Sequence, residues 1–184
     1  MYTKLLIAAA AVVMMLTACK EKKSSEDIIV SKPEVLKPEA PIRMQERHDS
    51  VEVKWLSALY TVRIDRTPQD SLPMVKDEIG QQYVDNSIRL TVSRADGSVF
   101  FGRTFTKGSF ASYLDDNYRR TGILEALVFD EVDDGRLQFA VSISRPQSDD
   151  EFIPLEMKID RNGGVVIKRD EHMDTNGDDD GDDD

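Results

Sequence analysis

In the segment Leu137-Gln-Phe-Ala-Val-Ser-Ile143, large apolar residues alternate one by one with small or polar residues. Strict alternation puts the apolar side chains on one face of a β-strand and the polar ones on the other, as a sheet with one buried face requires. The same pattern recurs over 88–93 and 153–160, and shorter runs begin at Val51 and at Tyr60. The sequence therefore predicts a domain that is mainly β, or α+β at most.

Short turns between these runs join neighbouring strands. Asp96-Gly97, Asp134-Gly135 and Asn162-Gly-Gly164 each separate two apolar-rich runs, and Gly and Asn supply the positive φ that tight hairpins need. We expect an antiparallel meander of about seven to nine strands, folded as a β-sandwich or as a curled half-barrel. The run 123–129 is apolar on both faces, which predicts a central or doubly covered strand.

One short helix is predicted near residues 109–115. Ser109 can cap its first turn, and Phe110, Tyr113 and Leu114 share one face at helical spacing. We expect this helix to close one end of the sheet or to cover an edge.

The N-terminus has the features of a secretion signal over residues 1–18. Lys4 supplies positive charge, residues 5–16 form an unbroken apolar run, and the small residue Ala18 precedes Cys19. The rival interpretation is a membrane-spanning helix. The apolar stretch would reach only about 21 Å as a helix, which is short of the ~30 Å hydrocarbon core. A signal that is removed is therefore expected.

The tetrapeptide Leu16-Thr-Ala-Cys19 resembles the lipobox of bacterial lipoproteins. The resemblance implies cleavage before Cys19, diacylglycerol on its sulfur, and often a further acyl chain such as palmitate on the new amino group. Two or more acyl chains hold a protein stably at a bilayer. The alternative is a chance cysteine in an ordinary secretory signal. Because Cys19 is the only cysteine, a lipidated chain keeps no thiol for disulfide, zinc or nucleophile chemistry.

The mature chain divides into a linker, a domain and a tail. Residues 19–45 combine mixed charge with three prolines, which is typical of an extended linker. Residues 46–173 are long enough for a single β-rich domain with its own core. Residues 174–184 have no apolar side chain and predict a disordered acidic tail, which contributes to the formal net charge of −11.

Part of this tail matches a calcium-binding loop. Asn176, Asp178, Asp180 and Gly181 fit the first positions of the EF-hand pattern, but the bidentate glutamate would fall beyond residue 184. A solvated tail that binds calcium weakly is therefore expected in place of a built metal site. No cofactor is expected.

The sequence offers few groups for catalysis. The two histidines, His48 and His172, lie near the ends of the predicted domain, and no serine-hydrolase, phosphate-loop or zinc-protease motif is present. Nucleic-acid binding is not expected, because the net charge is negative and no basic stripe interleaves with aromatic residues.

Carboxylates occur in runs at 115–116, 130–131, 133–134 and 149–151. Paired carboxylates could serve a glycosidase-type hydrolase. The same residues are favoured at turns, where they bond the local backbone. We favour the turn interpretation and expect that the protein is not an enzyme.

Polar residues around the entrance to the strand at 88–93 form the one candidate ligand site. Tyr83, Asp85, Asn86 and Lys107 could make a polar contact patch. Alternatively, Asp85 and Asn86 bond the backbone where the chain enters a strand. Trp55 shares its face with apolar neighbours and is equally well explained as a core residue.

Several residues and motifs share a characteristic spacing: Trp55, Tyr60, Asp77-Glu-x-Gly-x-x-Tyr-x-Asp-Asn86, Phe105-Thr-Lys-Gly-Ser-Phe110 and Gly122-Ile-Leu-Glu-Ala126. In this spacing the chain resembles a family of uncharacterised Bacteroidetes lipoproteins that carry a domain of unknown function. The resemblance covers nearly all of the mature domain. It implies an envelope lipoprotein, and it implies no activity and no catalytic residue.

These features predict an outer-membrane lipoprotein whose domain faces the periplasm. Lys20 differs from the aspartate that retains lipoproteins at the inner membrane in enterobacteria. Surface export in Bacteroidetes favours an acidic run after the cysteine, whereas this chain has Lys20-Glu-Lys-Lys23, so a cell-surface location is the alternative.

We expect the domain to be a non-catalytic binding or scaffold module. Its partner besides the membrane would be an envelope protein, a glycan or another small ligand. The alternatives are a carboxylate-dependent hydrolase that acts on envelope glycan or peptide, and a purely structural lipoprotein.

Overall fold

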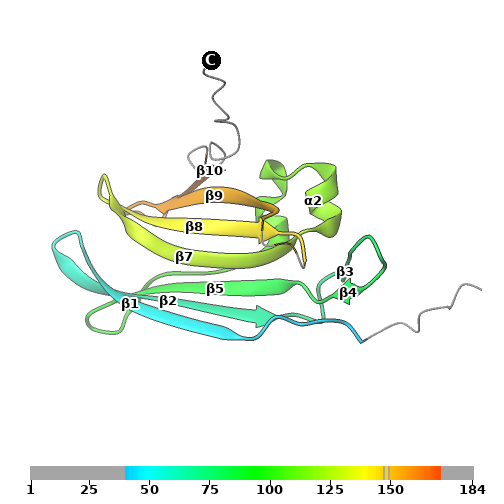
Figure 1. The fold of residues 1–184 in the computed structure, drawn as a ribbon. Helices are drawn as coiled ribbons and strands as arrows, with labels where there is room; N and C mark the ends of the chain where they lie inside the picture. The colour runs from blue at the N-terminus through cyan, green and yellow to red at the C-terminus, as the bar shows by residue number, and fades with distance from the viewer. Residues whose placement is uncertain (1–39, 147, 149, 171–184) are drawn as a thin grey trace, which may run out of the picture. The chain divides into compact units, whose positions relative to one another are not determined.

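The computed structural model describes residues 40–170, apart from Gln147 and Asp149. The predicted signal, Cys19, most of the predicted linker, His172 and the acidic tail lie outside the described residues. Within them, the chain forms two four-stranded antiparallel sheets that lie as two layers (Figure 1). None of the helices described is long and apolar enough to cross a bilayer.

Each sheet is a meander. The first has the order β1-β2-β5-β6 and contains β1 (Arg47–Trp55), β2 (Ala58–Pro68), β5 (Asn86–Arg94) and β6 (Val99–Thr106). The second has the order β10-β9-β8-β7 and contains β7 (Ile123–Asp133), β8 (Arg136–Ser144), β9 (Phe152–Ile159) and β10 (Val165–Arg169). A small hairpin of β3 (Val75–Lys76) and β4 (Gln82–Tyr83) is inserted between β2 and β5.

The alternating residues build the core between the two layers. Ile88, Leu90 and Val92 of β5 are fully buried, and so are Leu137 and Phe139 of β8. Their polar neighbours along each strand lie on the outer faces, as the period of two requires. The mainly β fold is confirmed, and the two facing sheets make it a sandwich.

The predicted hairpin turns are confirmed by their backbone. Gly97 and Gly163 have φ of 82° and 80°, and Asp134-Gly135 has φ of 46° and 68°. A further hairpin joins β1 to β2 through Leu56 and Ser57, whose φ values of 49° and 62° are also positive. That turn contains no glycine or asparagine, so the sequence carries no turn signal there.

The helical segment differs from the prediction. It is a 3-10 helix, η1 (Lys107–Tyr113), followed by a second helix, α2 (Asp116–Thr121), that the sequence pattern did not predict. Ser109 takes part in the cap of η1 as the third residue of a capping box, because its Oγ accepts a hydrogen bond at 3.1 Å from the backbone N–H of the N-cap residue Thr106. Asp115 caps α2, because its Oδ1 accepts from the N–H of Tyr118 at 2.8 Å.

The position of β7 corrects a second expectation. Its apolar sequence predicted a central or doubly covered strand, but β7 lies at the edge of its sheet. Only its beginning is covered on both sides, since Leu124 enters the main core while Ile123 packs with Val75 and Tyr83 of the small hairpin. Further along, Val128 remains exposed.

Candidate functional site

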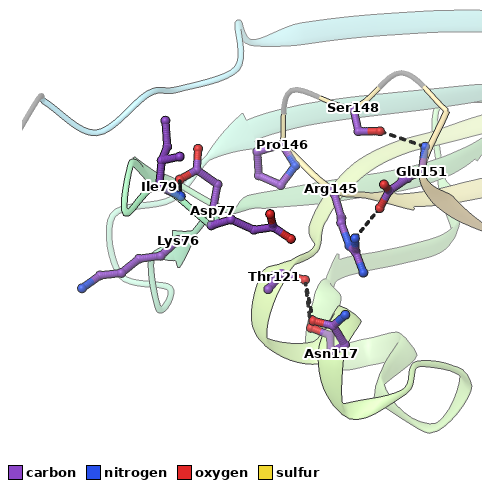
Figure 2. A pocket seen from close by; sticks show the side chains of 10 residues that line it. Lys76, Asp77, Ile79, Asn117, Thr121, Arg145, Pro146, Ser148 and Glu151 are labelled. Atoms are coloured by element: carbon purple, nitrogen blue, oxygen red, sulfur yellow. Dashed lines mark hydrogen bonds and ion pairs between the residues drawn. The ribbon is translucent and has the colours of Figure 1, made fainter.

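A pocket of about 400 Å³ opens where the β3–β4 hairpin faces α2 and the loop after β8. Figure 2 shows the side chains of these three segments around it. The lining residues are Lys76, Asp77, Glu78, Ile79, Asn117, Thr121, Arg145, Pro146, Ser148 and Glu151. We call this cavity the hairpin pocket.

Asp77 shapes one wall of the hairpin pocket. Its Oδ1 accepts hydrogen bonds from the backbone N–H of Ile79 at 3.1 Å and of Gln81 at 2.9 Å, and these bonds fix the hairpin loop. Its Oδ2 accepts from the hydroxyl of Tyr83 at 3.1 Å. Burial, together with the neighbouring Asp77 carboxylate, raises the pKa of Tyr83 to about 12.

Arg145 forms the opposite wall. Its guanidinium lies 5.1 Å from the centre of the Tyr118 ring and pairs through Nη1 with Glu151. Its Nε is buried and has no hydrogen-bond partner among the described residues. The backbone N–H of Glu151 in turn donates to the Ser148 hydroxyl at 3.1 Å.

The hairpin pocket also presents polar groups that the described chain leaves unpaired. The side chains of Lys76 and Glu78 and the amide nitrogen of Asn117 make no hydrogen bond or ion pair with another described residue. Thr121 donates from Oγ1 to the backbone carbonyl oxygen of Asn117 at 3.0 Å, so the lone pairs of Oγ1 remain available. The pocket therefore offers both donors and acceptors to a ligand.

The structure brings three of the predicted site residues together in the interior. Asp85 is 3% exposed and Asn86 is fully buried. Asp85 Oδ1 accepts from the N–H groups of Asn86 at 2.8 Å and Leu124 at 2.9 Å. Asn86 donates from Nδ2 to the Leu124 carbonyl oxygen at 2.9 Å and to the Met44 sulfur at 3.1 Å, while its Oδ1 has no partner among the described residues.

Lys107 completes this interior network. Its Nζ donates to the Gly122 carbonyl oxygen at 2.6 Å and lies 3.6 Å from Asp85 Oδ2. Burial lowers the pKa of Lys107, and the Asp85 carboxylate opposes that effect. The arrangement joins η1 and the starts of β5 and β7, which matches the interpretation of Asp85 and Asn86 as bonding the backbone at a strand entrance. Tyr83 stands apart from it, against Asp77.

Most residues of the acidic runs that the structure describes lie at turns or element ends, as expected, but Asp130 and Glu131 lie within β7, where the turn interpretation was wrong. Asp115 caps α2, Asp116 pairs with Arg119, Asp130 accepts from Gln138, Asp133 pairs with Lys158, and Glu151 pairs with Arg145. His48 lies on β1 with its Nδ1 2.7 Å from Asp65. Trp55 is a core residue, and its ring contacts Tyr60 and Phe100 edge-on.

No local pattern in the sequence points to Arg145, Asn117 or Thr121. They become neighbours only because α2 and the loop after β8 end at the same side of the sandwich as the small hairpin. The polar run at 77–86 was the one available signal, and it supplies Asp77 and Glu78 to the pocket. Among the residues that the structure describes, no group of three metal-ligating side chains comes together.

Comparison with known proteins places the chain in one family. No curated protein matches it. A family model described as a domain of unknown function, DUF4738, matches residues 28–167, which include all of the described β-sandwich except the end of β10. The chain therefore belongs to the DUF4738 family.

Proposed function

We propose that this protein is an envelope lipoprotein, of the kind found in Bacteroidetes, whose sandwich domain is a non-catalytic binding module. The support for the anchor is the secretion signal and the lipobox-like sequence that ends at Cys19. The domain would be held at the outer membrane and face the periplasm, with acyl chains as its attachment.

The hairpin pocket is the binding site in this proposal. Its volume of about 400 Å³ falls in the usual range for small-ligand sites. The observation that carries the proposal is that three separate segments enclose a pocket whose hydrogen-bonding groups are partly unpaired. Glu78 is an acceptor and the Asn117 amide is a donor, and a sugar hydroxyl can pair with either. A neutral, hydroxyl-rich ligand such as a unit of an envelope glycan suits this mixture.

The anchor is tested by mass spectrometry of the full chain purified from membranes. We expect a chain that begins at Cys19 and carries the mass of a diacylglycerol and a further acyl group. A retained signal or an unmodified Cys19 thiol would contradict the anchor. Protease treatment of intact cells tests the membrane face, because a periplasmic domain stays uncut while a surface domain is removed.

Ligand binding is tested with the lipidated full chain in detergent micelles on a glycan array. Asn117→Ala removes one donor to the ligand, and we expect binding of the recognised glycan to fall about tenfold, since such a hydrogen bond contributes roughly 1 to 1.5 kcal/mol. Asn162→Ala in the β9–β10 turn is the matched control and should bind as the unaltered chain does. The pocket assignment fails if no glycan binds, or if both variants behave alike.

A hydrolase is the second candidate, because Asp77, Glu78 and Glu151 line the same pocket. Asp77 already accepts three hydrogen bonds and Glu151 pairs with Arg145, so Glu78 is the carboxylate with a free side chain. Glycoside hydrolysis uses two carboxylates, one as acid and one as base or nucleophile. The hydrolase is favoured over the binding module if the protein releases reducing ends from an envelope glycan and the Glu78→Gln variant does not.

A further inference from the structure

Strand β7 has an open outer edge although its sequence resembles that of an interior strand. Among residues 40–170 as the structure describes them, it is the last strand of its sheet, and β8 is its only partner in that sheet. Val128 and Val132 remain exposed. An edge strand presents a row of unpaired backbone N–H and C=O groups, and apolar side chains beside that row favour the addition of another strand.

Next to this edge, part of the inner face of β1 is not covered by the second sheet. β7 packs mainly across β5 and β2, so the inner face of β1 extends past it. Val53 on that face is 7% exposed, whereas Val51 on the same face is 42% exposed. Together with Val62, Ile64 and Phe129, Val51 lines a hollow of about 260 Å³ between β1 and β7. We call this hollow the β1–β7 ledge.

At each end of the β1–β7 ledge, one hydrogen bond joins the two sheets. At one end Arg66 donates from Nη1 to the Glu125 carbonyl oxygen at 2.6 Å, and at the other Trp55 donates from Nε1 to the Gly135 carbonyl oxygen at 2.9 Å. Both bonds join the first sheet to the second. The spacing between the sheets is therefore fixed on either side of the hollow.

We propose that the outer edge of β7 accepts an extended segment of a partner protein as an added strand. Alternate side chains of that segment would lie on the β1–β7 ledge and take the place of solvent against Val51 and Phe129, while its backbone would pair with β7. This is the β-augmentation mode of peptide recognition, in which backbone hydrogen bonds give affinity and alternate side chains give specificity. The proposal is independent of the hairpin pocket.

Charge determines which segment fits. β7 carries four acidic side chains and no basic one. Asp133 pairs with Lys158, while Glu125 lies just before the stretch Ala126–Phe129 and Asp130 and Glu131 lie just after it. If two copies of β7 paired antiparallel over Ala126–Phe129, Glu125 of each copy would face Asp130 of the other; like charges across paired strands are destabilising, so a second copy of β7 is disfavoured as the added strand. A segment that alternates lysine or arginine with apolar residues complements both the acidic edge and the apolar ledge.

The bulges of β7 limit the length of the contact. The pairing with β8 shifts between Leu124 and Ala126 and again between Phe129 and Val132, and it is regular over Ala126–Phe129. At about 3.3 Å per residue this regular stretch spans roughly 13 Å, which is enough for a short strand. Bulges also stop pairing beyond their position, so the partner is a short motif and not a whole sheet edge.

The test uses a capped peptide of about eight residues that alternates lysine and valine, and the lipidated full chain in micelles. Hydrogen exchange should slow by about tenfold or more, when the peptide is present, at those amides of Leu127–Phe129 that point away from β8. Peptide affinity, measured by fluorescence anisotropy, should fall about tenfold or more in Val51→Asp, because this change puts an uncompensated charge on the ledge. Val166→Asp on β10, at a site that is 60% exposed, is the matched control and should leave affinity unchanged.

Circular dichroism of each variant checks that the sandwich remains folded, and the milder Val51→Thr change should give an intermediate loss of affinity. The proposal is overturned if the peptide leaves exchange in β7 unchanged, or if Val51→Asp and Val166→Asp bind equally. It is also overturned if a glutamate–valine peptide binds as well as the lysine–valine peptide. Protection of β7 that rises with protein concentration in the absence of peptide would identify a second copy as the occupant instead.

Discussion

The carboxylate of Asp85 accepts a hydrogen bond at 2.9 Å from the backbone N–H of Leu124, a residue 39 positions away. Asp85 lies just before β5 in the first sheet, and Leu124 lies at the start of β7 in the second. The bond therefore links the two layers of the sandwich. Because Lys107 lies 3.6 Å from the other carboxylate oxygen, the buried charge of Asp85 also has a cation beside it.

Removing the Asp85 carboxylate should weaken the sandwich strongly. Asp85→Ala leaves two backbone N–H groups and the Lys107 ammonium without their buried partner, and we expect the free energy of unfolding to fall by about 3 to 5 kcal/mol. Asp85→Asn should cost less, because the amide oxygen still accepts from Leu124. Urea unfolding followed by the fluorescence of Trp55, the only tryptophan, measures both. Equal losses in the two variants would show that the hydrogen bonds contribute little.

Stability above pH 10 should report on Tyr83. Its folded-state pKa of about 12 exceeds the ordinary value of 10, since burial and the Asp77 carboxylate disfavour the phenolate. The unfolded chain thus loses this proton first, and the stabilising contribution is complete below about pH 10 and is lost as the pH rises toward 12. Urea unfolding at pH values between about 8 and 12 should show a smaller alkaline loss in Tyr83→Phe. An unchanged pH profile in that variant would contradict the assignment.

Gly122 should resist substitution for a steric reason. A Cβ at this position would lie 2.8 Å from both the Ile143 side chain and the Tyr118 carbonyl oxygen. Gly122→Ala should therefore lower the free energy of unfolding by about 1 to 3 kcal/mol through overpacking. Gly102→Ala is the matched control on β6, where the nearest atom to the new Cβ is 3.5 Å away. Thermal unfolding of the two variants should separate them, and equal melting temperatures would refute the steric explanation.

The β1–β2 turn offers a stabilising change. Leu56 and Ser57 both have positive φ, a conformation that costs a residue with a side chain about 1 kcal/mol or more. Replacing the pair with Asn-Gly, the preferred sequence of this turn type, should raise the free energy of unfolding by roughly 1 kcal/mol. Leu56 is 46% exposed, so the lost burial is limited. A lower melting temperature in the double variant would mean that Leu56 packs more tightly than its exposure indicates.

Local patterns in the sequence were sufficient for the strands with one buried face and for their glycine-containing turns. The alternation over Leu137–Ile143 appears directly as the buried and exposed faces of β8. The patterns failed where neighbouring structure decides the outcome. The turn at Leu56-Ser57 has no local signal, and the apolar run of β7 indicated burial on both faces although none of the described strands lies beyond it.

The candidate sites likewise include features that a local sequence pattern indicated and features that it did not. Polar residues at 77–86 were recognisable as unusual, but their sequence could not separate Asp77, which shapes a pocket, from Asp85, which bonds inside the sandwich. Both are aspartates that accept backbone hydrogen bonds, and only their surroundings differ. Arg145 and Asn117 had no local signal, because a pocket built from three segments exists only when those segments meet.

The antiparallel strands with one apolar face could be predicted from the sequence, since a period of two is a local property of the backbone. Tertiary packing sets which strand lies at an edge, which polar residues are buried and where the hairpin pocket and the β1–β7 ledge open. Those outcomes depend on how the two sheets are offset when they pack, and that offset is set by contacts between residues far apart in the chain.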